Sequence, residues 1–265
     1  MQTSKIIRWL VWVSMFVNHL YPLRAQDGLR KVDNRAFKFG EILTYRVHYG
    51  FLDGAYATIK IDDKAQVING RSTYHIIGTG ETKGAWDFFF KVRDRYETFI
   101  DENSLCPLMF IRRVNEGGFK INQDMIFDQE YHVINSNGKQ FANMPAYVQD
   151  MLSAFYFART LPFCNEINGR IDSVITFVDD KVWCLKIKFI RYDTINTDVG
   201  RIRCMLFEPL VQKGRIFKKS EDLTVWISDD LNHIPLRAQA NLLVGSIKMD
   251  LVSYSGIAEE FNKLR

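Results

Sequence analysis

The sequence is poor in cysteine and lacks the residue spacing of a metal site. It holds only four cysteines, Cys106, Cys164, Cys184 and Cys204, and no two of them form a CxxC pair. None of the five histidines lies at the spacing of metal ligands. We therefore expect no metal site and no cofactor. Because Cys184 and Cys204 lie in strand-like runs, where a buried thiol packs as a small apolar side chain, free thiols are favoured over disulfides.

Linkers and internal repeats are also missing. No stretch is rich in Gly, Pro or Ser, and no segment of the chain repeats another. The sequence therefore offers no boundary at which a second domain could begin. We expect a single β-rich domain over residues 37–257, preceded by a flexible segment at 26–36 and followed by a C-terminal tail at 258–265.

The apolar run near the N-terminus, WLVWVSMFV at residues 9–17, is too short to span a bilayer comfortably. It follows Lys5 and Arg8 and precedes the small residue Ala25, which is the arrangement of a signal peptide at 1–25 that is cleaved after Ala25. An uncleaved anchor helix is the alternative. No cysteine lies near the cleavage site to carry a lipid, so we expect a periplasmic protein that is not a lipoprotein and contacts membranes only transiently.

A large excess of positive charge is absent as well. The whole chain has 35 Lys and Arg residues against 31 Asp and Glu residues, a formal net charge of +4. Removal of the signal peptide takes away Lys5, Arg8 and Arg24 and lowers this charge to +1. So small a charge does not attract a phosphate backbone, and we expect no nucleic-acid partner.

What the sequence does contain is a regular alternation of apolar and polar residues. Leu43, Tyr45 and Val47 share one side of a strand, and Asp53-Gly54 and Asn69-Gly70 are turn signals. Similar runs predict about a dozen strands joined by short turns. Because so many flat strands would leave long exposed edges, the sheet should curl. The expected fold is mainly β, with a large curved antiparallel sheet (an open or closed barrel-like meander) and one central helix at about 145–161.

One segment, PAYVQDMLSAFYFARTLPF at 145–163, has helical periodicity. Pro145 suits a first turn, Asn143 suits a cap, and Pro162 disfavours helix beyond it. Apolar side chains cover about half of the circumference, which is more than a surface helix needs. The helix either plugs the sheet as part of the core or lines an apolar cavity that a ligand enters. In the second case Phe155, Tyr156 and Arg159 are candidate ligand-binding residues.

A second candidate lies in VRDRYETFID at 92–101, where Asp94 falls in the apolar row between Arg93 and Arg95. An acid on the packed side of a strand needs a cationic or hydrogen-bonding partner, and Arg159 of the helix is a candidate for that role. The alternative to a binding site is a purely structural ion pair or a turn aspartate.

Two further motifs resemble catalytic sites only superficially. Ser228, Asp229, Asp230 and His233 bring together a hydroxyl, two acids and an imidazole, but their crowding favours a hairpin turn over a catalytic triad. The stretch GTGETKG at 78–84 lacks the Lys-Ser/Thr ending of a phosphate-binding loop. We therefore assign no catalytic residue.

Several short islands between residues 37 and 257 form a recognisable set. They are Gly40-Glu41-x-Leu43-x-Tyr45, Gly54, Lys91-x-Arg93-Asp94-Arg95, Pro107, Asp150-x-Leu152-Ser153-Ala154-x-Tyr156-x-x-Arg159, Gly200-x-x-x-Cys204, Val225-Trp226-x-Ser228-Asp229-Asp230 and Pro235. In this order they resemble the bacterial family known as domain of unknown function 3108.

The resemblance implies an exported envelope protein with no assigned activity, so it transfers no catalytic residues. Asp94, Arg95, Asp150 and Arg159 fall in the islands, either as candidate binding residues or as residues that hold the helix against the sheet. By analogy of fold alone, the resemblance also implies a curved sheet around a helix, similar to the half-barrels of periplasmic lipoprotein carriers.

These observations support three hypotheses. The leading one is a periplasmic binding or carrier protein that holds a hydrophobic or lipid-like ligand between the curved sheet and the helix. The second is an envelope structural or assembly protein that binds a protein partner through an exposed sheet edge or a surface patch. The third is an uncharacterised hydrolase-like enzyme.

Overall fold

The computed structural model describes residues 28–50, 52–163, 168–210, 223–241 and 245–264. The chain divides into two compact units, Met1–Arg30 and Lys31–Arg265, and the fold described below is that of the second unit. The predicted signal peptide at 1–25 lies outside the described residues. Within the described part of the chain, no helix combines the length and the apolar character needed to cross a bilayer.

Strands make up most of the second unit. In chain order they are β1 (Ile42–Tyr49), β2 (Leu52–Ile61), β3 (Gln66–Ile68), β4 (Arg71–Thr82), β5 (Arg93–Asp101), β6 (Pro107–Glu116), β7 (Phe119–Asp128), β8 (Val133–Ser136), β9 (Lys139–Phe141), β10 (Ile171–Val178), β11 (Lys181–Thr197), β12 (Gly200–Pro209), β13 (Leu223–Ser228), β14 (Pro235–Asn241), β15 (Ser246–Ser255) and β16 (Lys263–Leu264). The helices of the described residues are α2 (Ala85–Phe89) and α3 (Met151–Arg159).

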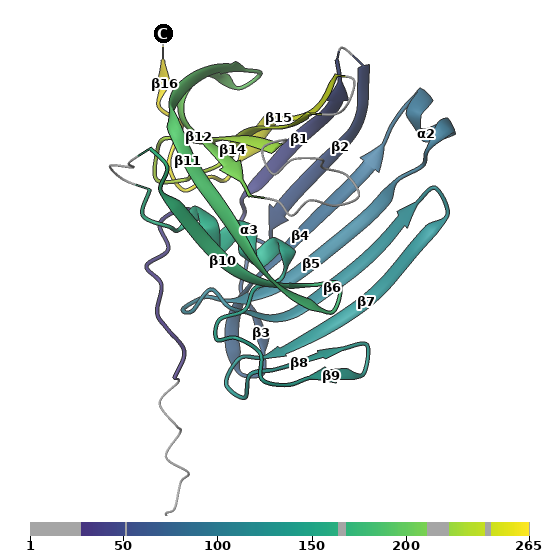
Figure 1. The fold of residues 1–265 in the computed structure, drawn as a ribbon, viewed down its shortest axis with the longest axis vertical. Coiled ribbons are helices and arrows are strands. Elements are labelled where there is room, and N and C mark those ends of the chain that lie inside the picture. Colours follow the sequence, from purple (N-terminus) through teal and green to yellow (C-terminus); the bar gives the residue numbers. More distant parts are fainter. Residues whose placement is uncertain (1–27, 51, 164–167, 211–222, 242–244, 265) are drawn as a thin grey trace, which may run out of the picture. The chain divides into compact units, whose positions relative to one another are not determined.

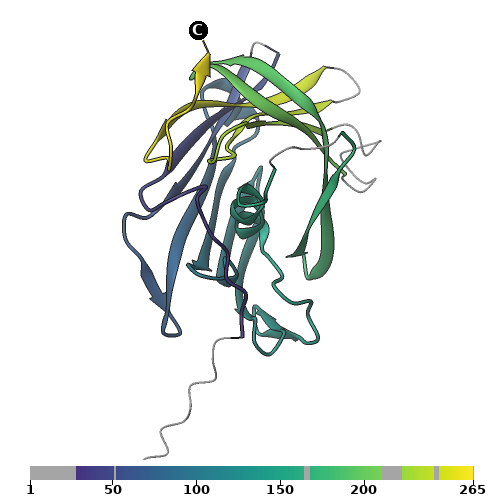
Figure 2. The same cartoon turned by 90° about the vertical axis from the view of Figure 1, so that its left-hand side faces the viewer.

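All sixteen strands found in the described residues belong to one antiparallel sheet. Its order is β10-β11-β12-β13-β14-β15-β1-β2-β4-β5-β6-β7-β8-β9, while β16 pairs with β12 and β3 with β4 (Figure 1). This is a meander in which a C-terminal strand, β15, joins an N-terminal strand, β1. The sheet bends around α3, which lies inside the curve (Figure 2). The prediction of a mainly β protein with a large curved antiparallel sheet around a helix is confirmed, and the sheet is open rather than closed.

The two faces of the sheet differ in chemistry, as the alternation predicts. Gly78 of β4 lies on the face toward α3, because a Cβ placed on it would be 3.3 Å from Cδ2 of Leu152. Residues paired across antiparallel strands share a face, so the same face includes Ile59 of β2 and Tyr96 of β5. This helix-facing side is largely apolar. The outer side carries ion pairs, among them Arg95–Glu97 and Arg237–Asp250.

The central helix is shorter than the sequence pattern predicts. It begins at Met151 instead of residue 145 and ends at Arg159, which gives nine residues. Asn143, the predicted cap, and Tyr147 both have positive φ angles, of 58° and 60°. Such left-handed residues interrupt an α-helix, so the predicted first turn does not form.

The segment before α3 has another structural role, which explains the shorter helix. The backbone N–H of Met144 donates to the carbonyl of His132, beside the β8 end of the sheet. The backbone of Gln149 exchanges two hydrogen bonds with β10, at the other end. The segment therefore connects the two ends of the open sheet, and its backbone groups are not available for helical hydrogen bonds.

The segments that flank the sheet are packed. Ala36 and Phe37 are buried, and the Val32 N–H donates to the carbonyl of Asn103 over 2.8 Å. Within the segment predicted at 26–36, residues from Val32 onward therefore contact the rest of the fold. In the predicted tail at 258–265, Phe261 is buried and β16 extends the sheet.

The cysteines are thiols wherever the structure describes them. Cys204 is free and buried, and burial raises its pKa to about 12. Cys106 is a buried thiol that donates to the carbonyl of Ser104. Cys184 is free but exposed, contrary to the expectation of a buried thiol, because the first residues of β11 have solvent on both sides. Cys164 lies outside the described residues.

Candidate functional site

The C-terminal end of α3 holds a buried ion pair. The guanidinium of Arg159 donates from Nη1 and Nη2 to the two carboxylate oxygens of Glu41, over 2.6 and 2.8 Å. Its Nη2 also donates to the carbonyl of Ala36, and its Nε donates to that of Asn232. The Tyr156 hydroxyl donates to the same carboxylate of Glu41 over 3.0 Å. One arginine thereby joins the helix, the start of β1, the N-terminal segment and the β13–β14 turn.

The pair is charged and inaccessible. Both side chains are nearly solvent-free, at 2% exposure for Arg159 and 0% for Glu41. Burial alone lowers the pKa of Arg159, but the adjacent Glu41 carboxylate outweighs this and raises it. Burial also raises the pKa of Tyr156 well above its ordinary value. Through these contacts Arg159 and Tyr156 hold the helix in position, and the nearly buried Arg159 also forms part of the lining of the pocket described below.

The N-terminal end of α3 is held by a second buried acid, Asp150. Its carboxylate accepts hydrogen bonds from the N–H groups of Leu152 and Ser153 and, over 2.6 Å, from the hydroxyl of Thr98 on β5. The Ser153 hydroxyl in turn accepts from the Asp150 N–H, which completes a capping box. Burial raises the pKa of Asp150 to about 6, although these hydrogen bonds oppose the shift. Asp150 is therefore a helix cap.

Asp94 and Arg95 lie away from the helix ends. Asp94 accepts a hydrogen bond from the Asn115 N–H, and Arg95 donates to Glu97 on the outer side of β5. The suggested pairing of Asp94 with Arg159 is wrong, because Nη1 and Nη2 of Arg159 both donate to the carboxylate of Glu41. Of the six candidate residues, the structure brings together Phe155, Tyr156 and Arg159, whose guanidinium carbon lies 5.9 and 5.0 Å from the two ring centroids.

The motif at residues 228–233 forms a turn, as predicted. One carboxylate oxygen of Asp230 accepts from the Ser228 hydroxyl and from the N–H groups of Asn232 and His233. Ser228 is fully buried, and its oxygen also accepts from the Ile234 N–H. His233 donates through Nδ1 to the carbonyl of Arg159. The imidazole thus holds the helix end and does not activate the serine.

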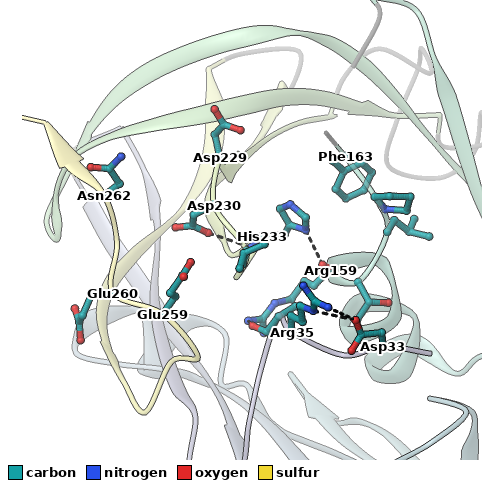
Figure 3. A pocket seen from close by; sticks show the side chains of 15 residues that line it. Asp33, Arg35, Arg159, Phe163, Asp229, Asp230, His233, Glu259, Glu260 and Asn262 are labelled. Carbon is teal, nitrogen blue, oxygen red and sulfur yellow. Dashed lines mark hydrogen bonds and ion pairs between the residues drawn. The ribbon is translucent and has the colours of Figure 1, made fainter. Parts of the chain in front are cut away.

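A pocket of about 580 Å³ opens beside this turn, at the C-terminal end of α3 (Figure 3). The carboxyl groups in its walls come from Asp33, Asp229, Asp230, Glu259 and Glu260, and the apolar part of its lining includes Leu161, Pro162, Phe163 and Leu231. Arg35 pairs with Asp33, and Arg203 pairs with Asp229. Burial lowers the pKa of His233, which keeps the imidazole neutral. The remaining charge of the walls is negative, so the pocket suits a cationic group and repels an anionic lipid headgroup.

A different part of the helix-facing side is mostly apolar and only partly covered, with Asp94 of β5 directly opposite Gly80. Over Gly78 the side chain of Leu152 fills the space, but a Cβ placed on Gly80 would meet no described residue closer than Asp94, at 3.9 Å. The register places other small or apolar residues around Gly80, and each is only partly buried. We call this set the open face; it consists of Val47, Ala55, Ala57, Gly80, Ala238, Ala240 and Met249.

The helix adds to this partly covered apolar surface. Its most buried residues are Ser153, Ala154, Tyr156 and Arg159. The oily residues of the same helix are less covered: Met151 is 43% exposed, and Leu152, Phe155 and Ala158 are partly buried. The helix therefore leaves part of its apolar stripe accessible, whereas an ordinary amphipathic helix buries this stripe most completely. Among the candidate residues, Phe155 belongs to this accessible stripe.

Sequence reasoning missed Glu41, the partner of Arg159. A signal for it was present, because Glu41 lies in the same alternating row as Leu43 and Tyr45 and therefore on the packed side of β1. An acid in that row requires a buried cation. The open face was not predicted as a unit, since its residues come from strands far apart in the sequence.

The chain resembles proteins whose functions are not assigned. It matches the family described as "Protein of unknown function (DUF3108)" over residues 44–252, and no curated protein matches it. Among solved structures, a β-barrel-like protein of domain of unknown function DUF1849 from Brucella abortus has a TM-score of 0.51 at 9% identity, with 86% of this chain and 99% of the other covered. That similarity shows the fold.

Two further structural matches are more distant. The hypothetical protein CT021 from Chlamydia trachomatis has a TM-score of 0.39 at 9% identity, over 87% of this chain and 94% of the other. A protein from Bacteroides fragilis NCTC 9343, provisionally described as exported and with a YmcC-like fold, has a TM-score of 0.34 at 10% identity, over 85% and 99%. Neither is close enough to support an argument about function.

Proposed function

Because the chain belongs to the DUF3108 family of proteins of unknown function, we propose a function from its own geometry: a periplasmic carrier that binds a hydrophobic or lipid-like ligand. The ligand would lie against the open face, beside the accessible stripe of α3. Phe155 would contact it, while Arg159, Tyr156 and Asp150 would hold the helix in position.

The observation that carries this proposal is the uncovered space over Gly80. A soluble β protein normally fills the inner side of a curved sheet with large side chains, because exposed apolar area costs about 25 cal/mol per Å². Here alanine and glycine occupy part of that side, and Met151 and Phe155 of the helix are exposed or only partly buried. Small residues on the concave side, together with an incompletely covered apolar helix, leave room for an apolar guest, which is the usual composition of a small-molecule site.

The test fills this space. Gly80 has an ordinary backbone conformation, so Gly80→Phe places a ring over the open face without strain at Cβ. We expect the substitution to weaken binding of a fluorescent apolar probe, 1-anilinonaphthalene-8-sulfonate, by about tenfold or more. Native mass spectrometry of the wild-type protein should also reveal a co-purified lipid that the variant lacks.

The control is Thr79→Phe, which places the same ring on the outer side of the same strand, at an exposed position. This variant should bind the probe like the wild type. Equal binding by Gly80→Phe and wild type, or a wild-type protein that repeatedly carries no lipid and binds no probe, would refute the carrier proposal.

The location in the periplasm rests on the N-terminal sequence. Lys5 and Arg8, the apolar run at 9–17 and the small residue Ala25 support a cleaved signal peptide. We expect the mature protein recovered from a periplasmic extract to begin at Gln26, as N-terminal sequencing or intact-mass measurement can establish. A mass that corresponds to the full chain would indicate an uncleaved anchor, and a mass increase typical of acylation would indicate a lipoprotein.

The two alternative functions have less support. An assembly protein that adds a strand to the sheet needs a long free edge, but Gln149 already pairs with part of β10, and the opposite edge strand, β9, has only three residues. A hydrolase needs an accessible nucleophile, but Ser228 is fully buried and hydrogen-bonded within its turn. The carrier proposal uses residues that are accessible and otherwise unexplained.

A further inference from the structure

We propose that the tip formed by α2 and the β6–β7 turn docks this protein onto the surface of an anionic lipid bilayer. We call this surface the aromatic tip; it consists of Phe88, Phe89, Phe90 and Phe119, with Lys91 and Lys120 beside them. The inference goes beyond ligand binding, because a bilayer contact does not require the open face to be occupied.

The first observation is exposure. Phe88 is 88% exposed, Phe89 78% and Phe119 61%, and Phe90 is also exposed. Single exposed apolar residues are common on soluble proteins, but consecutive phenylalanines on a projecting turn indicate a contact surface. At a bilayer, each ring that enters the interface would leave water.

The second observation is that these rings are held outward by a specific network. Arg93 donates to both oxygens of Asp87 in α2, over 2.7 and 3.0 Å, and the Thr82 hydroxyl donates to the same carboxylate over 2.8 Å. The Gly117 N–H donates to the Lys91 carbonyl over 2.9 Å, which ties α2 to the β6–β7 turn. A surface that is ordered before binding loses less conformational entropy when it binds.

Close packing completes this platform. Gly117 has a φ of 54°, and a Cβ on it would lie 2.6 Å from the ring of Phe90. The glycine therefore allows the ring to lie over the turn, next to the strand that begins with Phe119. The aromatic residues of two separate hairpins thereby form one continuous surface.

The third observation is charge, and it favours a bilayer over an apolar protein partner. Two acids near the rings are already paired, Asp87 with Arg93 and Glu81 with Lys83. Glu116, at the end of β6, lies beside Asp94, and burial together with this neighbouring carboxyl raises the pKa of Glu116. Lys91 and Lys120 follow Phe90 and Phe119 directly in the chain and are exposed. Rings flanked by lysines match an interface in which aromatic side chains enter the headgroup layer and ammonium groups meet lipid phosphates.

The position of the tip extends this surface. Tyr49 pairs with Leu52 across the β1–β2 turn and with Ile247 of β15, and all three side chains are exposed. The strand register places these turns and the aromatic tip at the same end of the sheet (Figure 1). The open face lies toward this end, so a docked protein would present it to the bilayer.

The experiment is flotation of the processed periplasmic protein with phosphatidylcholine vesicles that contain about one-third phosphatidylglycerol. We expect the wild type to float with these vesicles. The double variant Phe88→Ser/Phe89→Ser should lower the partition coefficient about tenfold or more, since both rings would no longer enter the interface. Lys91→Gln/Lys120→Gln should lower it severalfold, and vesicles of phosphatidylcholine alone should bind the wild type more weakly.

The matched control is Val67→Ser/Tyr131→Ser. These two apolar residues are comparably exposed, Val67 at 70% and Tyr131 at 74%. They lie in β3 and in the β7–β8 turn, at the ends of β4 and β7 that are farther from the aromatic tip. It should float like the wild type. A wild type that stays with the soluble fraction, or a Phe88→Ser/Phe89→Ser variant that floats equally well, would overturn the proposal. If the wild type did not float but sedimented as a dimer, and Phe88→Ser/Phe89→Ser sedimented as a monomer, the bilayer proposal would be overturned in favour of self-association through the aromatic tip.

The docking proposal and the carrier proposal fail separately. Gly80→Phe leaves the aromatic tip intact and should float like the wild type. Phe88→Ser/Phe89→Ser leaves the open face intact and should bind the apolar probe like the wild type. An effect of either substitution on both measurements would show that the two surfaces are one site.

Discussion

Replacement of Arg159 by methionine should lower the free energy of unfolding by about 3–5 kcal/mol, the largest effect expected for any single substitution in this protein. The change leaves the Glu41 carboxylate buried without its cation, at 0% exposure. It also removes the donors to the carbonyls of Ala36 and Asn232. An uncompensated buried charge costs far more than the pair contributes when it is intact, because its hydration has been lost.

The same reasoning predicts that removal of both charges is tolerated. The double variant Arg159→Met/Glu41→Leu should recover most of the lost stability, since it replaces the pair by apolar groups of similar size. Urea unfolding of both variants measures this, and Arg95→Met is the control, because Arg95 is half exposed and pairs with Glu97 on the outer side. If Arg159→Met proved as stable as Arg95→Met, the pair would not be what fixes the C-terminal end of the helix.

The strands could be predicted from the sequence because each depends on a local signal. The alternation through Leu43, Tyr45 and Val47 predicts a strand. The Asn69-Gly70 turn predicts a hairpin. Neither prediction depends on distant parts of the chain. The helix start was predicted wrongly for the opposite reason. Residues 145–150 are apolar enough for a helix, but the backbone of Gln149 bonds to β10 and that of the preceding Met144 bonds to the turn after β7, both of which are distant in sequence.

The sequence predicted which helix residues belong to the candidate site, but it did not predict the acid with which they pair. Arg159 and Tyr156 are where the pattern placed them, on the central helix, but the acid that joins them is Glu41, more than a hundred residues earlier. Asp94 is also an acid in an apolar row, but its carboxylate accepts a hydrogen bond from the backbone N–H of Asn115 and does not pair with an arginine of the helix. A single sequence shows that a buried acid needs a partner, but it does not show which partner the fold supplies.

The second large effect concerns Asp150 and depends on pH. The folded-state pKa of this carboxyl is about 6, above its ordinary value of 3.8, because burial disfavours the charged form. Well below pH 3.8 the group is protonated in both states. As pH rises from 4 to 6, the unfolded chain loses its proton while the folded chain retains it, so the free energy of unfolding falls. The difference of about two pKa units corresponds to roughly 3 kcal/mol, which is lost by neutral pH.

Substitution of Asp150 by asparagine should remove this pH dependence and leave the cap in place. An amide oxygen can accept from the Leu152 and Ser153 N–H groups, and the amide NH₂ can donate to the Thr98 hydroxyl. Urea unfolding between pH 4 and 7.5 should therefore give a flatter curve for Asp150→Asn than for the wild type.

Two further variants separate the cap from the charge. Asp150→Ala should be less stable than Asp150→Asn by about 2–3 kcal/mol at every pH, because it leaves buried N–H groups without an acceptor. Asp128→Asn controls for the loss of an exposed carboxylate near a turn. Parallel curves for the wild type and Asp150→Asn would mean that the hydrogen bonds to the carboxylate fully offset its burial, so that Asp150 would be an ionised cap with an ordinary pKa.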